Sequence, residues 1–381
     1  MKIYDVLAFD GIPTTGAATG LGTGNTVPGT RLRGVSIGYI GTGNNPGYSK
    51  GVGNTLRMFS SGGIISGNGG HTFACASALY LADSAPELLG KTTTITFGFR
   101  TVVEQAGNWN PNALQVFSLA FANSNITGPN WPKTITAADF AVTPAVGATH
   151  YWEVVFDRVK KLARVYRDNT YVKTVDFSAD VAANGELVGF ILPMYCTTGN
   201  YGSGNCIVGF RDMYLAEVEA GDVCDRLGPQ VTKMLPVVSV NAAWTANVPA
   251  TGVVASLNDQ QPRMDTPPAA GVMTSVAVTD NDPNGVITFS TDGLLTTDKI
   301  AAVMYQVDAI SPGATGKLES KLLNGSSEEA TVSIDCVSGF SSGRLPSLAG
   351  WAKKAHVKQF PAAGANKATV GNYKLKLRAS A

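Results

Sequence analysis

Apolar and polar positions alternate most regularly over residues 150–177. Trp152, Val154 and Phe156 occupy every second position there, which is the period of a β-strand that buries one face. Charged positions at 158–161 interrupt the alternation, which resumes over two shorter segments on either side of an Arg-Asp-Asn turn. We therefore expect a meander of three short antiparallel strands.

The same period predicts strands on both sides of this meander. A first group comprises 92–103, 113–122, 187–195 and 206–218, and a second comprises 285–291, 299–310, 318–323, 329–335 and 373–379. Helical patterns are confined to 75–82 and 136–140. Short strands separated by turn residues indicate a sandwich or a barrel, so the expected fold class is all-β.

Chain length and a change of composition predict two domains. At 381 residues the chain exceeds the size at which a single core usually stops growing. After Ala220-Gly221-Asp222 the strand pattern gives way to a connection rich in Pro, Ala and Thr. We place a first domain at 1–222, a linker at 223–245 and a second domain at 246–381.

Charge and composition argue against several partners. The 29 Lys and Arg residues balance 28 Asp and Glu residues, and a net charge of +1 provides no field that would steer the chain onto nucleic acid. No apolar run reaches the length of a membrane span, and MKIYDVLAFDG lacks the layout of a secretory signal. We expect synthesis in a cytosol, no nucleic-acid partner and no membrane span.

Five scattered cysteines argue against a zinc ribbon and against a disulfide scaffold. Cys196 and Cys206 are the exception, because they flank a turn-forming insert and would meet across a hairpin. A disulfide between them would close a short loop and contribute roughly 2–3 kcal/mol to stability. The alternative is a pair of reduced thiols at strand ends, which the expected reducing compartment favours.

Residues suited to catalysis are sparse. His71, His150 and His356 stand in unrelated contexts, so we expect each at the surface or at a strand end rather than in a triad or a metal centre. Glu217 and Glu219 share a strand face, as the carboxylate pair of a glycosidase would. They lie at the predicted domain exit, however, where solvated acids are common.

Two further acidic groups are weaker candidates. Glu153 and Asp157 share a face but lie roughly 13 Å apart on a straight strand, too far to act together. Asp280, Asn281 and Asp282 offer oxygens to calcium, although a plain turn also accounts for them and the EF-hand spacing is absent. We expect no catalytic residues, no metal and no cofactor, and therefore no enzyme.

Candidate binding residues lie in loops and in the last strand. Trp109, Trp131 and Tyr201 stand in polar loops rich in Gly and Asn, where their rings would stack on sugars or, as we favour, pack against a neighbouring subunit. A second group, on one face of the C-terminal strand, comprises Lys374, Lys376 and Arg378. These side chains would protect a sheet edge from pairing or meet an acidic surface on a partner.

Several motifs resemble those of known families. The FGFR strand, the HYWEVVFDR meander and the IVGFRDMYLAEVE strand resemble concanavalin A-like jelly-roll domains of lectins and virion proteins. The motif DRLGP at 225–229, followed by Val231, Leu235-Pro236 and Trp244, resembles the join after such a domain in structural proteins of tailed bacteriophages. Segments 300–303, 316–318 and 324–325 are similar to that family's second β domain, whereas the basic segment 352–381 departs from its tryptophan-containing close.

The resemblance implies a concanavalin A-like jelly-roll sandwich followed by a second, smaller β-sandwich domain. It implies a structural component of a tailed-phage virion, in the tail, the collar or a capsid-surface appendage, which acts in particle assembly through protein–protein contacts. The implied partners are other virion proteins and further copies of the chain, and the implied location is the virion, assembled in the host cytoplasm. The alternative hypothesis is a module that binds host surface glycans, and a glycoside hydrolase is a third and weaker hypothesis.

Overall fold

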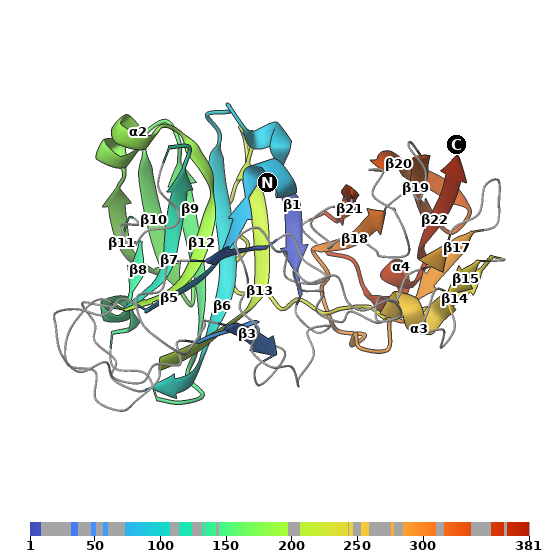
Figure 1. Ribbon diagram of the computed structural model, residues 1–381, viewed down its shortest axis with the longest axis horizontal. Helices are drawn as coiled ribbons and strands as arrows, with labels where there is room; N and C mark the ends of the chain where they lie inside the picture. Colours follow the sequence, from blue (N-terminus) through green and yellow to red (C-terminus); the bar gives the residue numbers. More distant parts are fainter. Residues whose placement is uncertain are drawn as a thin grey trace. The chain divides into compact units, whose positions relative to one another are not determined.

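The computed structural model forms two compact units, residues 1–232 and 233–381. The structure describes residues 1–8, 32–36, 47–50, 56–59, 73–106, 114–123, 132, 134–141, 145–196, 206–242, 244–246, 253–258, 276–277, 285–309, 316–336, 352–361 and 364–380. Each unit is built from antiparallel strands (Figure 1). The units are therefore described one at a time.

The first unit consists of two sheets. The strands of the larger sheet are β1 (Lys2–Leu7), β3 (Gly47–Lys50), β4 (Leu56–Phe59), β6 (Thr94–Ala106), β9 (Thr149–Asp157), β10 (Leu162–Arg167), β11 (Thr170–Asp176) and β13 (Cys206–Val218). Those of the smaller sheet are β2 (Arg33–Ser36), β5 (Phe73–Tyr80), β7 (Leu114–Phe121), β8 (Ile135–Thr136) and β12 (Leu187–Cys196). The larger sheet has the order β11-β10-β9-β6-β13-β4-β3, with β1 also paired to β13, and the smaller has the order β2-β5-β12-β7-β8.

An aromatic core joins the two sheets of the first unit. Phe97 and Phe99 project from β6 and stack on Phe190 of β12 at 4.8 Å and on Phe117 of β7 at 4.9 Å. All four rings are fully buried, and each contributes about 1.5–3 kcal/mol relative to an exposed ring. Because side chains alternate along a strand, Thr96 and Arg100 on β6 point to the outer face of the larger sheet.

The predicted meander is confirmed. Strands β9, β10 and β11 pair consecutively, with Val154 opposite Val165 and Tyr166 opposite Tyr171. The β10–β11 turn holds Asp168 and Asn169 at φ values of 48° and 67°, the left-handed region that Asp and Asn tolerate better than other residues with side chains.

Among the described residues of the first unit, helical structure comprises α1 (Leu81–Ser84), α2 (Ser178–Asn184) and the 3-10 turns η1 (Pro86–Leu88) and η2 (Ala137–Phe140). The turn η2 confirms the helical pattern predicted at 136–140, and Thr136 and Asp139 form a capping box at its start. The helix predicted at 75–82 is wrong, because 73–80 form β5 between β2 and β12. Pairing on both sides overrides the local preference of this segment.

The second unit also consists of antiparallel strands. Its elements are β14 (Val237–Asn241), β15 (Thr245–Ala246), α3 (Val253–Asn258), β16 (Val276–Ala277), β17 (Val286–Phe289), β18 (Ala302–Ala309), β19 (Gly316–Asn324), β20 (Ser327–Cys336), β21 (Ala352–Gln359), α4 (Lys367–Gly371) and β22 (Tyr373–Ser380). Five strands form a sheet in the order β14-β17-β22-β19-β20, and the pairs β18–β21 and β15–β16 form two small sheets. Tyr305 and Val307 of β18 share a core with Leu322 of β19 and Leu375 of β22, so the β18–β21 pair packs on one face of the five-stranded sheet.

These sheets confirm the predicted fold class, an all-β jelly-roll sandwich followed by a smaller β-sandwich. The connection between the units differs from the expected linker at 223–245. Residues up to 232 belong to the first unit and form hydrogen bonds with its larger sheet. Among the described helices, none combines the length and the apolar character that a membrane crossing requires.

Candidate functional site

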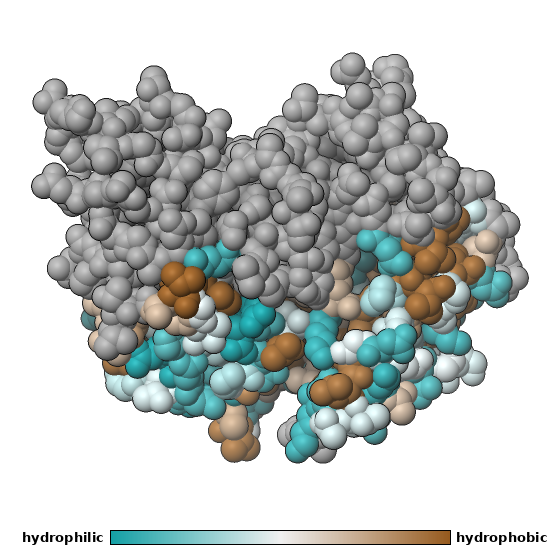
Figure 2. Space-filling model, turned by 90° about the horizontal axis from the view of Figure 1, so that it is seen from below, coloured by the Kyte–Doolittle hydropathy of each residue, from teal (hydrophilic) through white to brown (hydrophobic). Residues whose placement is uncertain are grey.

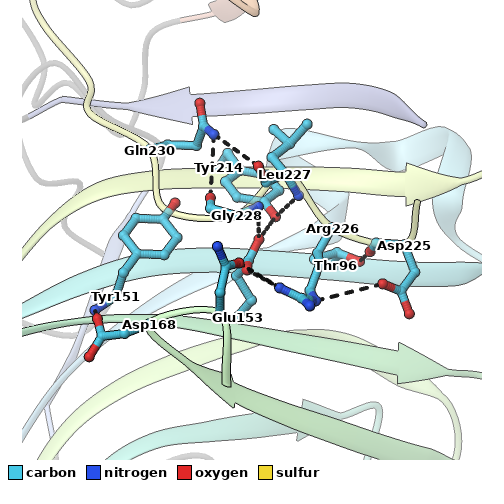
Figure 3. Close-up of polar contacts among 11 residues, drawn as sticks. Thr96, Tyr151, Glu153, Asp168, Tyr214, Asp225, Arg226, Leu227, Gly228 and Gln230 are labelled. Carbon is cyan, nitrogen blue, oxygen red and sulfur yellow. Dashed lines mark hydrogen bonds and ion pairs between the residues drawn. The ribbon is translucent and has the colours of Figure 1, made fainter. Parts of the chain in front are cut away.

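A chain segment crosses the outer face of the larger sheet in the first unit. Residues 225–232, which we call the clasp, pass over the central strands β6, β9 and β13 (Figure 3). Strand alternation turns Tyr151 and Glu153 of β9 toward the clasp, on the face opposite the phenylalanine core. Tyr214 of β13 lies beside them. The clasp thereby covers a group of ionisable side chains.

Glu153 lies at the centre of this group. Its side chain is 1% exposed, and one carboxylate oxygen accepts hydrogen bonds from the Tyr214 hydroxyl at 2.5 Å and from the Gly228 backbone N–H at 2.8 Å. The Arg226 guanidinium lies 3.4 Å from the other oxygen. A carboxylate this deeply buried requires such partners, because an unpaired charge away from water is costly. Glu153 therefore ties β9 to β13 and to the clasp.

Asp212 holds the far end of the clasp. It is buried, with a φ of 54°, where β13 bulges away from its register with β6. Its carboxylate accepts from the Thr232 backbone N–H at 2.9 Å and pairs with Arg100 of β6 at 2.7 Å. Arg100 also donates to the Gln230 carbonyl at 2.9 Å. The sheet thus binds main-chain groups of the clasp at alternate residues 228, 230 and 232.

Two tyrosines under the clasp are held as hydrogen-bond donors. Tyr214 donates to Glu153 and accepts from the Leu227 backbone N–H at 3.0 Å, and Tyr151 donates to the Asp212 carbonyl at 3.2 Å. Burial, together with the negative charge of Glu153, raises the pKa of both hydroxyls well above its ordinary value. Both tyrosines therefore stay protonated at neutral pH, and neither is poised as a general base.

Gly98 of β6 provides the space for these rings. A Cβ atom at this position would collide with the Tyr214 ring and would lie 2.9 Å from the Tyr151 hydroxyl. Glycine is therefore required here by a close approach of two side chains to the backbone.

The outer face of β10 and β11, beside the clasp, is open to solvent. Tyr171 is 54% exposed, and its ring meets that of Tyr166 edge to face at 5.8 Å. The Arg226 guanidinium lies over the Tyr166 ring, 4.1 Å from its centroid, and donates to the Asn169 side chain at 2.7 Å. An ion pair of 2.7 Å between Arg164 and Asp225 flanks them. We call these residues the tyrosine rim: Arg164, Tyr166, Asn169, Tyr171, Asp225 and Arg226.

The two parts of this site offer different chemistry. Glu153 and Asp212 are occupied by bonds within the chain, so the buried part fixes the clasp. The tyrosine rim instead presents an aromatic face and polar groups to solvent. Within the described ranges, no group of three or more His, Cys, Asp or Glu residues is placed to hold a metal ion.

The structure does not test the aromatic residues predicted for binding. Trp109, Trp131 and Tyr201 fall outside the described residues, as do His71 and the acidic turn at 280–282, so these predictions stay untested. Sequence reasoning missed both the clasp and the tyrosine rim. The signal that could have found them is the alternation in β9–β11. It places Tyr151 and Glu153 on one face, and it places Tyr166 and Tyr171 next to one another.

Cys196 and Cys206 do not flank a hairpin. Cys196 ends β12 in the smaller sheet, whereas Cys206 begins β13 in the larger one. The expected cross-hairpin pairing is therefore wrong, because the chain changes sheets between the two residues. The disulfide itself stays a prediction, since both side chains lie outside the described part.

Glu217 and Glu219 do not form a carboxylate pair. Glu217 is buried and accepts hydrogen bonds from Tyr4 and Thr93, each at 2.7 Å, and from Lys91 at 3.1 Å, whereas Glu219 is exposed beyond the end of β13. Burial by itself raises the pKa of Glu217, but these three partners outweigh it and hold the pKa below its ordinary value. A carboxylate held in its ionised form is unsuited to act as a general acid.

His356 was expected at the surface or at a strand end, and this expectation is wrong, because it is buried within β21 (Ala352–Gln359). It is 4% exposed, and its Nε2 lies 3.0 Å from the Ser320 hydroxyl and 3.1 Å from the Ser320 carbonyl, because β21 turns this residue toward the five-stranded sheet. Burial lowers its pKa, despite the opposing bond with the Ser320 backbone. His150, in β9, is half-buried and bonds through Nδ1 with Asp168 at 2.7 Å.

The basic face predicted for the last strand is present. Lys374, Lys376 and Arg378 alternate with buried Leu375 and Leu377 along β22. The strand lies between β17 and β19, however, in the middle of its sheet. Protection of a free edge is therefore the wrong explanation for these cations.

Comparisons with known proteins yield only distant similarities. No protein-family model matches the sequence, and no curated protein matches it. A solved sialidase is 9% identical over 49% of this chain and 17% of its own, with a TM-score of 0.31. Alginate lyase A1-II', a member of polysaccharide lyase family 7, is 11% identical over 45% of this chain and 82% of its own, with a TM-score of 0.29. A seed lectin of Lotus tetragonolobus is 11% identical over 49% of this chain and 99% of its own, with a TM-score of 0.26.

These similarities correct one prediction. We expected the chain not to be an enzyme, yet the similar structures include a sialidase and alginate lyases by name. The scarcity of histidine and of paired carboxylates does not by itself exclude enzymatic activity. At such low scores, the similarities carry no argument about what this chain itself binds or converts.

Proposed function

We propose that this chain is a carbohydrate-binding protein and that the tyrosine rim of its first unit contacts the sugar. The observation that carries this proposal is the Tyr171 ring, which is 54% exposed on the outer sheet face and meets the ring of Tyr166. An aromatic ring left in solvent offers an apolar surface on which the C–H face of a sugar can stack.

Polar side chains around the Tyr171 ring are available to form hydrogen bonds with a sugar. The Arg164 side chain is 41% exposed and that of Asp225 29%, so both retain positions that can bond with sugar hydroxyls. Arg226, itself a clasp residue, lies over Tyr166 and bonds with buried Glu153, which orders this part of the rim before any ligand arrives. Preorganisation of this kind reduces the entropic cost of binding.

Replacement of the exposed ring tests the proposal. The full chain is applied to an array of neutral and acidic oligosaccharides, and the strongest ligand is titrated by calorimetry. Tyr171→Ala should weaken binding about tenfold, roughly 1.4 kcal/mol, because the stacking surface is lost. Tyr171→Phe keeps the ring and should stay within about twofold of the wild type.

A second control tests whether the loss of any exposed apolar side chain weakens binding, or only the loss of the Tyr171 ring. Val159 is 69% exposed in the turn between β9 and β10, away from the rim residues, and Val159→Ala should leave affinity unchanged. Absence of binding across the array, or equal affinity of Tyr171→Ala and wild type, would refute the proposal.

A role in a tailed-phage virion is a second candidate, which rests on the resemblance of the join at 225–229. One observation favours protein contacts in this region. Val223 is 100% exposed and Val231 68% exposed, on either side of the motif that carries the resemblance. Figure 2 shows one face on which apolar side chains form separate patches among hydrophilic ones. Recovery of the chain in purified phage particles at a fixed ratio to the other proteins would support this role, and its absence from them would overturn it.

A further inference from the structure

The outer face of the five-stranded sheet in the second unit carries a row of cations. Leu375 and Leu377 of β22 point into the core, so Lys374, Lys376 and Arg378 point to the opposite face. Consecutive members of this row are two residues apart, which separates them by about 6.6 Å along the strand. Because β22 is a central strand, the row runs through the middle of the face and not along its rim.

The neighbours on this face leave two of the cations without an opposite charge. Lys321 of β19 lies opposite Lys376, but it is neutralised by Glu319 at 3.3 Å and Glu328 at 3.0 Å. On the other side of β22, Thr288 lies opposite Lys374. Among the described residues, neither Lys374 nor Lys376 forms an ion pair, although both are half-buried.

The charge and chemistry of this face suit a polymer with regularly spaced anions. The methylene stem of a lysine can lie along a sheet while its ammonium group reaches toward solvent, so cations at alternate positions of one strand can contact a linear ligand together. A nucleic acid has such charges, but single-stranded binding also draws on aromatic rings that stack with bases. In the described registers of this face, the outward positions include no aromatic residue.

We propose that this face binds an acidic polysaccharide, a polymer with carboxylates repeated along its sugars, through Lys374 and Lys376. Arg378 extends the row by one further position. This surface belongs to the second unit and is independent of the tyrosine rim, so either proposal can fail without the other.

Charge reversal tests this proposal on the full chain. Binding to polygalacturonate is measured by biolayer interferometry, with neutral dextran and single-stranded oligo-dT as comparison ligands. The double variant Lys374→Glu/Lys376→Glu should weaken binding to polygalacturonate at least about tenfold. Wild-type binding should also fall steeply as salt is raised, because the contacts are between exposed charges.

A matched control changes the net charge by the same amount elsewhere in the second unit. Lys299 and Lys354 are exposed, and neither belongs to the five-stranded sheet. Lys299→Glu/Lys354→Glu should leave affinity within about twofold of the wild type, since long-range charge alone is screened at physiological salt. Tyr171→Ala should also retain binding to polygalacturonate. If charge reversal in β22 unfolds the protein, Lys374→Gln/Lys376→Gln provides the same test.

Three outcomes would overturn the inference. These are no binding to polygalacturonate, equal weakening by the two charge-reversal variants, and tighter binding to oligo-dT than to polygalacturonate. The last result would identify the face as a surface for nucleic acid.

Discussion

The contacts between Glu153 and the clasp allow the loss of stability in a Glu153→Ala variant to be predicted. In Glu153→Ala the carboxylate that accepts from Tyr214 at 2.5 Å and from Gly228 at 2.8 Å is removed. Hydrogen bonds to a charged group contribute about 1.5–3 kcal/mol each. Arg226 is 25% exposed and retains its contacts with Asn169 and Tyr166, so the unpaired cation adds little to the loss. We expect the first unit to lose about 3 kcal/mol, the lower end of the sum of two such bonds.

The assay is urea unfolding, combined with calorimetry of the first unit's transition. For a unit of this size each kcal/mol lowers Tm by about 2–4 °C, so Glu153→Ala should lower it by about 6–12 °C. Glu87→Ala is the control, because Glu87 is exposed and its removal should change stability by less than about 0.5 kcal/mol. Limited proteolysis should also cut the clasp faster in Glu153→Ala. A loss below about 1 kcal/mol, with the clasp still protected, would refute the role assigned to this carboxylate.

Two further predictions concern Gly98 and His356. Gly98→Ala should destabilise the first unit by about 1–3 kcal/mol in the same unfolding assay, since the added methyl meets the Tyr214 ring; unchanged stability would contradict the packing described here. Burial holds the pKa of His356 below its ordinary value of 6.5, so the unfolded state binds the proton more tightly. The contribution of neutral His356 to the stability of the second unit should therefore be fully present above about pH 7. It should decrease as the pH falls below about 6.5 toward the pKa of His356 in the folded state. His356→Gln should remove this dependence, and an equal decline in wild type and variant would contradict it.

The strand pattern was largely predictable from the sequence. The alternation of Trp152, Val154 and Phe156 identified β9 together with its core-facing side, because a one-residue shift would move all three buried side chains to the opposite face of the sheet. The basic face of β22 was predicted for the same reason. Local patterns failed where pairing with distant strands decided the outcome, as in 75–80, which form part of a strand of the smaller sheet.

The candidate site depended on contacts that no local pattern contains. Gly228 lies 75 residues from Glu153 along the chain, and Tyr214 lies 61 residues from it. The sequence marked residues 225–229 as a distinctive join but not as a segment bound to the larger sheet. In the same way, the cations of β22 were visible in the sequence, whereas their place at the centre of a sheet was not.

The amino-acid sequence by itself determined the β character of this chain, its two-part organisation and the faces of its strands, because the period of side chains along a strand is a local property. Only the tertiary structure decided which strands are neighbours, that residues 225–232 cover Glu153, and which aromatic and basic groups remain in solvent. The physical reason is that these outcomes depend on the free energy of burying charges and rings against partners far away in the chain, which the order of neighbouring residues does not specify.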